Sequence, residues 1–229
     1  MRALRADGWT VFAVARRADR LAALESATGA VAIPADIAED DDVSRLLAQV
    51  TKAGGIDTLV NIAGGARGAD RVGDASTDDW EWMYRVNVLG TMKLTRAFLP
   101  MLRATGGGTV LNLTSTAGLD AYEGGGGYNA AKFGQHALTN ALRLEEAEHN
   151  VRVIEVAPGL VQTEEFALNR LGDAQAAGKV YQGVEKPLTA EDVADVVRYA
   201  VTVPHHINLD QIVIRPVAQA ATHKLIRKG

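Results

Sequence analysis

The 229-residue sequence contains no cysteine. This absence excludes a disulfide framework and a thiolate metal site, and it fits a reducing compartment. Aromatic residues are also scarce, at 5% of the chain, although 47% of the residues are hydrophobic. An apolar sequence with so few aromatic residues is typical of strands buried on both faces and of closely packed helices.

The sequence has no run that is long and apolar enough to span a bilayer. Its first residues, MRALRADGW, carry charges without the apolar core of a signal peptide. The net charge of −4 also disfavours binding to nucleic acid, because phosphate backbones require a concentrated basic surface. We therefore expect a cytoplasmic protein whose partners include neither nucleic acid nor a membrane.

Short apolar runs alternate with segments of helical periodicity along the whole chain. We predict strands at residues 10–15, 30–33, 57–61, 109–114, 151–156 and 211–215, and helices at 18–28, 39–53, 76–103, 128–148 and 189–203. This alternation indicates right-handed βαβ crossovers and a parallel sheet covered by helices on both faces. No repeat or linker interrupts the pattern, so a single α/β domain over residues 1–229 is predicted. The polar stretch at about 162–187 is expected to form a mobile flap.

One predicted helix carries a pair of side chains suited to proton transfer. Tyr128 and Lys132 are four residues apart, so they share a helix face. A nearby ammonium favours the phenolate, which would lower the pKa of Tyr128 from about 10 and make it a usable general acid or base. Ser115, just after a predicted strand, could hold a substrate oxygen against this phenol. Alternatively, the tyrosine–lysine spacing arises by chance and Ser115 bonds its own backbone.

This order of elements and motifs resembles the classical short-chain dehydrogenase/reductase family. The matching positions are Asn61-Ile-Ala-Gly64, Asn87, Ser115, Tyr128-x-x-x-Lys132 and Pro158-Gly-Leu-Val-Gln-Thr163. They extend over almost the whole chain. The resemblance implies a Rossmann-like, doubly wound sheet in three layers, and an oxidoreductase that interconverts a secondary alcohol and a carbonyl.

The resemblance also assigns roles to the catalytic residues. Tyr128 would give a proton to the carbonyl oxygen during reduction, or remove one from the alcohol during oxidation. Lys132 would lower the pKa of Tyr128 and hold the nicotinamide ribose. Ser115 would position the substrate oxygen, and Asn87 would anchor a water linked to Lys132. A buried asparagine satisfied by a neighbouring loop is the structural alternative for Asn87.

The choice of cofactor depends on Arg16 and Arg17, at the end of the first predicted strand. In dinucleotide-binding folds an acidic residue near this point binds the ribose 2′-hydroxyl, whereas arginine accommodates a 2′-phosphate. Two guanidinium groups and no acid favour NADP(H) over NAD(H), with a solvated basic turn as the alternative. By resemblance, further cofactor contacts fall on Asp36, Ile37, Asn61, Ala63, Gly64, Tyr128, Lys132, Pro158, Gly159, Val161 and Thr163. No metal site is expected.

Compared with the family, the chain lacks a first strand and the glycine-rich turn that receives the cofactor pyrophosphate. Residues 1–8 are expected to be the last turns of the following helix, ending at Gly8. The family strand order 3-2-1-4-5-6-7 makes the absent strand central, so its two neighbours would lose a shared partner. We therefore expect an N-terminally truncated chain that is unstable or rearranged and binds cofactor poorly. A start codon assigned too far downstream would explain this, as would a non-catalytic relative that acts as a binding or oligomer subunit.

The C-terminal segments 203–210 and 214–219 resemble the branch of the family that oxidises serine and other 3-hydroxy acids. A sugar alcohol or an unrelated ketone stays open as the substrate. Arg170 and Lys179 could meet a substrate carboxylate, but solvated charges are the interpretation adopted here. The family's usual assembly implies a homodimer or homotetramer through the helices around Asn87 and Tyr128.

Overall fold

The computed structural model describes residues 1–228. Its strands are β1 (Phe12–Ala15), β2 (Val31–Pro34), β3 (Thr58–Asn61), β4 (Thr109–Leu113), β5 (Arg152–Pro158), β6 (Gln211–Ile214), β7 (Gln219–Ala221) and β8 (Lys224–Leu225). Its α-helices are α1 (Arg2–Ala6), α2 (Ala18–Thr28), α3 (Asp40–Lys52), α4 (Thr77–Tyr84), α5 (Gly90–Ala104), α6 (Gly126–Glu146), α7 (Phe166–Leu171), α8 (Ala174–Tyr181) and α9 (Ala190–Thr202). Among residues 1–228, no helix combines the length and apolar character needed to cross a membrane.

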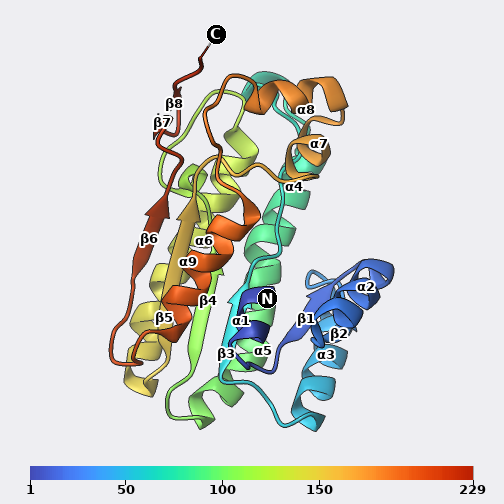
Figure 1. Cartoon of the computed structure of the whole chain (residues 1–229), viewed down its shortest axis with the longest axis vertical. Coiled ribbons are helices and arrows are strands. Elements are labelled where there is room, and N and C mark those ends of the chain that lie inside the picture. The colour runs from blue at the N-terminus through green and yellow to red at the C-terminus, as the bar shows by residue number, and fades with distance from the viewer. Residues whose placement is uncertain (229) are drawn as a thin grey trace.

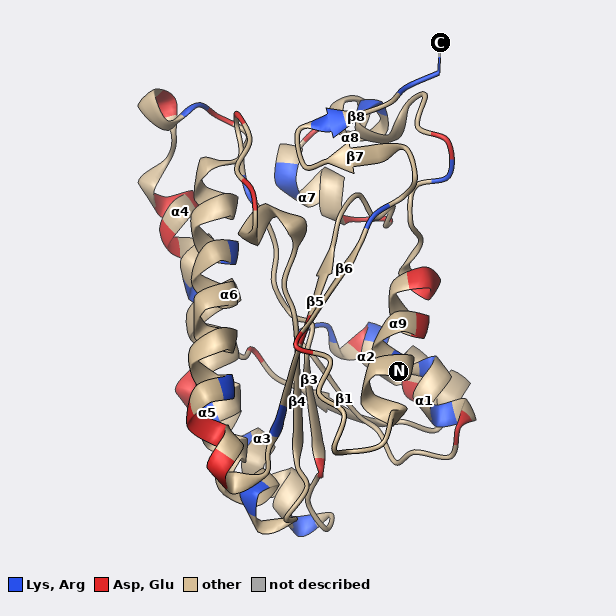
Figure 2. Cartoon of the chain, turned by 90° about the vertical axis from the view of Figure 1, so that its left-hand side faces the viewer, with Lys and Arg blue, Asp and Glu red and all other residues tan. Residues whose placement is uncertain are grey.

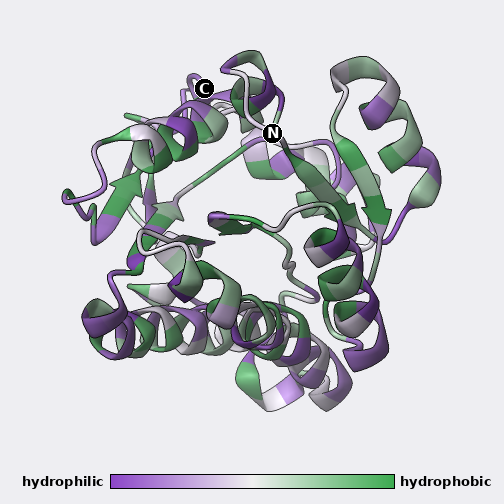
Figure 3. Cartoon of the chain, turned by 90° about the horizontal axis from the view of Figure 1, so that it is seen from below, coloured by the Kyte–Doolittle hydropathy of each residue, from purple (hydrophilic) through white to green (hydrophobic). Residues whose placement is uncertain are grey.

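Helices cover both faces of the parallel strands (Figure 1). Figure 2 shows α3, α5 and α6 on one face, and α1, α2 and α9 on the other. The neighbours β1–β2, β3–β4, β4–β5 and β5–β6 all run parallel. Every residue of β5 is buried, as expected for a parallel strand covered from both sides. The predicted three-layer parallel α/β fold is confirmed, and Figure 3 shows apolar residues along its strands.

The parallel strands form two separate sheets. In the described part of the chain β1 pairs only with β2, whereas β3, β4, β5 and β6 make a four-stranded sheet in that order. Figure 1 shows β1 and β2 standing to the right of β3. A cavity of about 560 Å³ lies between the facing edges of β1 and β3. The prediction that two strands would lack a shared partner is therefore confirmed.

The segment before β1 forms the predicted end of a helix. Leu4 on α1 is buried in the core beside Ile154 and Val197, which belong to β5 and α9. Gly8 follows the helix with a φ of +86°, a conformation that glycine adopts without strain. Since α1 packs on α9, it fastens the two-stranded sheet to the larger one by side-chain contacts.

The helix predicted at 76–103 is divided into three parts. Ser76 caps α4 by accepting a hydrogen bond from the backbone N–H of Asp79. The chain then makes a π-helical turn over Arg85–Leu89 before α5 begins. Asn87 lies in this turn, and such insertions are frequent at functional sites.

The segment predicted as a polar flap contains two short helices. α7 and α8 lie beyond the carboxyl ends of the strands, at the top of Figure 1. Asp173 caps α8 by accepting a hydrogen bond from the backbone N–H of Ala176. These helices were not predicted from the sequence, because each has eight residues or fewer and so shows no clear helical repeat of apolar residues. The mobility of the flap stays a prediction.

Candidate active site

The predicted catalytic side chains come from three elements that meet at the carboxyl end of β4. Ser115 follows β4, Tyr128 and Lys132 lie on α6, and Asn87 lies in the π turn. The Ser115 hydroxyl lies close enough to the Tyr128 phenol to favour its ionised form. The Lys132 Nζ lies 5.8 Å from the centre of the Tyr128 ring. The structure thus brings Ser115, Tyr128 and Lys132 together.

Gly64 links Asn87 to this group. A Cβ atom built on Gly64 would lie 2.4 Å from Asn87 Oδ1 and 3.7 Å from Lys132 Nζ. The backbone after β3 can therefore pass between these two side chains only where the residue is glycine. Asn87 is fully buried, and its Nδ2 donates to the carbonyl oxygens of Met83 and Gly65 at 2.7 and 2.9 Å. Asn87 thus binds the π turn to the loop after β3, and the water link stays a prediction.

Tyr128 lies under the flap with only 8% of its surface exposed. The ring of Phe166, on α7, meets it edge-on with centroids 5.8 Å apart. Burial raises the pKa of Tyr128 well above its usual value, although the neighbouring Ser115 hydroxyl and the charge of Arg170 act in the opposite direction. The phenol is therefore protonated at neutral pH.

Lys132 is buried, and its ammonium donates to the side-chain oxygen of Gln135 at 2.7 Å and to the Leu113 carbonyl at 3.3 Å. Burial lowers the pKa of Lys132 from 10.5 to about 7, and the buried carboxylate of Glu155 opposes this shift. The lowering of the Tyr128 pKa expected from the neighbouring ammonium does not occur in this arrangement, because burial disfavours both the phenolate and the ammonium. Lys132 instead becomes a group that can exchange a proton near neutral pH.

The polar residues that form hydrogen bonds with Lys132 and continue towards the π turn were not predicted from the sequence. Gln135 donates to the Thr91 hydroxyl at 3.1 Å, and that hydroxyl donates to the Asn87 carbonyl at 2.8 Å. Hydrogen bonds therefore connect Lys132 to the π turn. The position of Gln135, three residues after Lys132, was a usable signal for its part in this chain.

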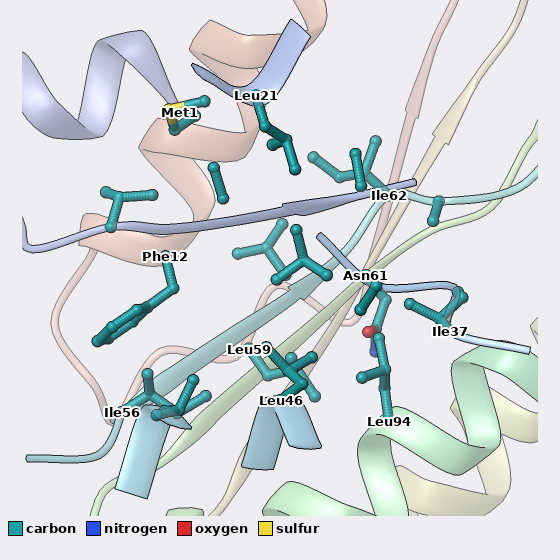
Figure 4. A pocket seen from close by; sticks show the side chains of 18 of the residues that line it. Met1, Phe12, Leu21, Ile37, Leu46, Ile56, Leu59, Asn61, Ile62 and Leu94 are labelled. Atoms are coloured by element: carbon teal, nitrogen blue, oxygen red, sulfur yellow. The ribbon is translucent and has the colours of Figure 1, made fainter. Parts of the chain in front are cut away.

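A second set of predicted residues surrounds the cavity between the two sheets, part of which Figure 4 shows. The predicted cofactor-binding residues that line it are Arg16, Arg17, Asp36, Ile37, Asn61, Ala63 and Gly64. Pro158, Gly159, Val161 and Thr163 do not line this cavity and lie at or after the end of β5. The backbone of Val161 pairs with Leu188, and the Thr163 hydroxyl accepts a hydrogen bond from the backbone of Phe166.

The two arginines predicted to bind a 2′-phosphate differ in their contacts. Arg17 makes a bidentate ion pair with Glu165 at 2.9 and 2.8 Å, and Arg20 reaches the same carboxylate at 2.6 Å. Arg16 is exposed and has no ion pair within residues 1–228. The carboxylate of Glu165 thus occupies the kind of contact that a phosphate would make with Arg17.

The residues that line the cavity suit the two nucleoside ends of a dinucleotide better than the pyrophosphate between them. The buried Oδ1 of Asn61 has no hydrogen-bond donor among residues 1–228, so the cavity offers an acceptor that a bound group could satisfy. Arg16, Arg17 and Asp36 also line the cavity. The interior, in contrast, is lined by apolar side chains such as Phe12 and Leu59, and Gly64 is its only glycine in the described chain. No glycine-rich turn is therefore present for the pyrophosphate.

Across residues 1–228 no cluster of three histidine, aspartate or glutamate side chains could hold a metal ion. The arrangement offers instead a phenol, a hydroxyl and a lysine beside a cavity at the strand ends. A parallel α/β fold with these groups defines a dehydrogenase that transfers hydride through a bound dinucleotide.

The match to a family model agrees with this class. The model described as short chain dehydrogenase matches residues 1–172. The chain therefore belongs to the short-chain dehydrogenase family and is an oxidoreductase.

Known relatives cover nearly the whole chain. An uncharacterized oxidoreductase of Mycobacterium tuberculosis is 48% identical over 224 residues, which are 97% of this chain and 87% of the relative. An NADP-dependent 3-hydroxy acid dehydrogenase of Salmonella typhi is 35% identical and covers 93% of this chain and 88% of its own length. The solved closed form of a serine dehydrogenase complexed with NADP+ is 34% identical with a TM-score of 0.93, over 100% of this chain and 93% of that structure.

Proposed function

We propose that this chain is an NADP(H)-dependent oxidoreductase that interconverts a 3-hydroxy acid and the corresponding 3-oxo acid, with Tyr128 as general acid and base. The observation that carries the proposal is the grouping of three side chains: the Tyr128 ring centre lies 5.8 Å from Lys132 Nζ, and the Ser115 hydroxyl lies close enough to the phenol to affect its pKa. The relatives named for 3-hydroxy acids, serine and NADP support the choice of substrate and cofactor.

Each side chain has a defined part in this chemistry. NADP(H), when bound, supplies the hydride in reduction or accepts it in oxidation. Ser115 and Tyr128 hold the substrate oxygen between their hydroxyl groups. In reduction Tyr128, which burial keeps protonated at neutral pH, gives its proton to the carbonyl oxygen. Lys132, with its pKa near 7, then returns a proton to Tyr128, and in oxidation the same transfers run in reverse.

Arg16 and Arg17 are the residues that would hold the 2′-phosphate of the cofactor. For Arg17 this requires exchange of the Glu165 carboxylate for the phosphate. Because Glu165 lies in the flap, directly before α7, binding of the phosphate would also change the contacts of the flap. The two arginines favour NADP(H) over NAD(H), since only NADP(H) carries the phosphate that they would bind, and the competing Glu165 carboxylate reduces this preference.

A second candidate function is that of a non-catalytic relative. The separation of β1 from β3, and a cavity lining that contains Gly64 as its only glycine among the described residues, favour this alternative. Without donors for the pyrophosphate, the chain is expected to bind NADP(H) weakly. The two candidates therefore differ in turnover rather than in fold.

One experiment with two readouts separates the candidates. The 229-residue chain is titrated with NADPH and followed by nucleotide fluorescence, and NADPH formation is then measured with a panel of 3-hydroxy acids. Turnover that is lost in Tyr128→Phe supports the oxidoreductase. NADPH binding without turnover of any substrate supports the non-catalytic relative. Turnover that survives in Tyr128→Phe contradicts the proposed chemistry.

A homo-oligomer through the long helices stays part of the proposal. Three large apolar side chains are exposed on α4 and α6, namely Tyr84 at 49%, Phe133 at 41% and Leu144 at 83%. Exposed apolar side chains on these two helices support an interface between copies of this chain. Size measurement by light scattering, with Leu144→Glu as the interface variant, tests this assembly.

A further inference from the structure

A cation from the flap stands beside the proposed catalytic phenol. The guanidinium carbon of Arg170 lies 5.8 Å from the centre of the Tyr128 ring. Phe166, four residues earlier on α7, meets the same ring edge-on. Residues four apart share a helix face. The helix α7 therefore presents one apolar and one charged side chain to Tyr128.

Neutral acceptors alone hold this guanidinium in place. Its Nε donates to the Gly68 carbonyl at 3.2 Å, Nη1 to the Tyr122 hydroxyl at 2.8 Å, and Nη2 to the Gly124 carbonyl at 3.0 Å. Within residues 1–228 no carboxylate lies within 4.0 Å of it. Each terminal nitrogen keeps a further N–H. A half-buried cation without a counter-charge is unfavourable, and an anionic ligand would relieve that cost.

The other charges around Arg170 do not supply this anion. A cavity of about 10 Å³ beside Tyr128 is lined by Arg170 and also by Arg67, Asp70 and Asp79. Arg67 lies 3.9 Å from Asp79, so those two charges neutralise each other. Asp70 is exposed to solvent. Among the charged side chains that line this cavity, Arg170 is therefore the cation left without a compensating charge.

We propose that Arg170 binds the carboxylate of the substrate and selects 3-hydroxy acids over uncharged alcohols, an inference that rests on the proposed function. At bond lengths of about 1.2–1.5 Å, a three-carbon acid spans about 4–5 Å from its hydroxyl to its carboxylate oxygens. A hydroxyl held by Ser115 and Tyr128 thus leaves the carboxylate within reach of a guanidinium beside the same ring. The planar fork of arginine matches a carboxylate in a bidentate pair.

The test compares 3-hydroxybutanoate with its uncharged methyl ester as substrates of the full chain with NADP+. Arg170→Met is expected to lower the ratio of kcat/KM for the acid to kcat/KM for the ester by about 10- to 100-fold, the size of a charge-assisted hydrogen bond. Arg170→Lys restores part of this ratio, because it keeps the charge without the fork. Lys179→Met, which removes an exposed cation from the same flap, is the matched control and keeps the wild-type ratio.

Calorimetric titration with 3-hydroxybutanoate, with and without NADP+, distinguishes this inference from the proposed function. Acid binding that Arg170→Met weakens by about tenfold or more, in a chain that turns over neither compound, supports the Arg170 site and rejects the oxidoreductase. Turnover with an acid-to-ester ratio unchanged in Arg170→Met overturns the Arg170 assignment and leaves the oxidoreductase intact. A wild-type chain that neither binds nor oxidises the acid overturns both. If Arg170→Met does not fold, Arg170→Lys carries the comparison, since it keeps a donor for the neighbouring carbonyls.

Discussion

Replacement of Lys132 by methionine is expected to remove a charge that destabilises the fold. The pKa of Lys132 falls from 10.5 to about 7 on folding. The unfolded chain therefore binds this proton more tightly than the native protein does, and native stability decreases as the pH falls from about 10.5 towards about 7. Because one pKa unit corresponds to about 1.4 kcal/mol, the buried ammonium costs about 4 kcal/mol at about pH 7.

The variant loses two favourable contacts together with the charge. The ammonium donates to Gln135 at 2.7 Å and to Leu113 at 3.3 Å, and its removal leaves the Gln135 oxygen without this donor. An unsatisfied buried acceptor costs about 1–3 kcal/mol. The free energy of unfolding of Lys132→Met is therefore expected to exceed that of the wild type by about 1–3 kcal/mol at about pH 7.

The pH dependence gives the sharper measurement. The destabilisation by Lys132 is about 2 kcal/mol smaller at about pH 9 than at about pH 7, whereas methionine does not titrate. Urea unfolding followed by tryptophan fluorescence at both pH values gives the difference between wild type and variant. Lys179→Met serves as the exposed control, with a change within about 0.5 kcal/mol at both pH values. A difference between wild type and Lys132→Met that stays constant across this range would refute the reasoning.

Three further predictions concern the site. Tyr128→Phe removes the transferable proton, so turnover measured by NADPH absorbance should fall by about 10²- to 10⁴-fold with unchanged circular dichroism, and retention of most activity contradicts the assigned role. Gly64→Ala places a Cβ 2.4 Å from Asn87 Oδ1, so the free energy of unfolding should fall by about 1–3 kcal/mol, and wild-type stability in urea contradicts the packing described. Glu165→Gln releases Arg17 from its ion pair, so the preference for NADPH over NADH in fluorescence titrations should rise by about three- to tenfold, whereas an unchanged preference means that the carboxylate does not compete with the 2′-phosphate.

Local patterns in the sequence were sufficient to predict most of the fold. The strands were predicted because a short apolar run bounded by turn residues indicates a buried strand whichever elements pack against it. The pairing of Tyr128 with Lys132 on one face of α6 was predicted because helical spacing fixes it. The π turn at Arg85–Leu89 was not predicted, because one slipped hydrogen bond leaves the apolar period of the helix nearly unchanged.

The electrostatics of the site depended on contacts between distant segments. The shift of the Tyr128 pKa follows from burial under the flap, which no local pattern describes. Arg170 was interpreted as a solvated charge, and this was wrong because it donates hydrogen bonds to Gly68 and Tyr122. These partners lie 102 and 48 residues away in the sequence, so no local pattern could indicate the contacts. Arg17 and Glu165, 148 residues apart, form an ion pair for the same reason. Only the folded chain brings these groups within reach of one another.

The division of the strands has a consequence for local unfolding. Within residues 1–228, no strand-to-strand hydrogen bond joins the β1–β2 sheet to the larger sheet. The smaller sheet can therefore detach without breaking the backbone hydrogen bonds between the strands of the larger sheet. An isolated pair of strands is only marginally stable, and this pair depends on the side chains that α1 and α3 bury against α9 and α5. Backbone amides of β1 and β2 are therefore expected to exchange with deuterium through a subglobal opening, at lower free energy than those of β4 and β5. The protein then has two cooperative units, and a ligand that binds residues of both would couple them.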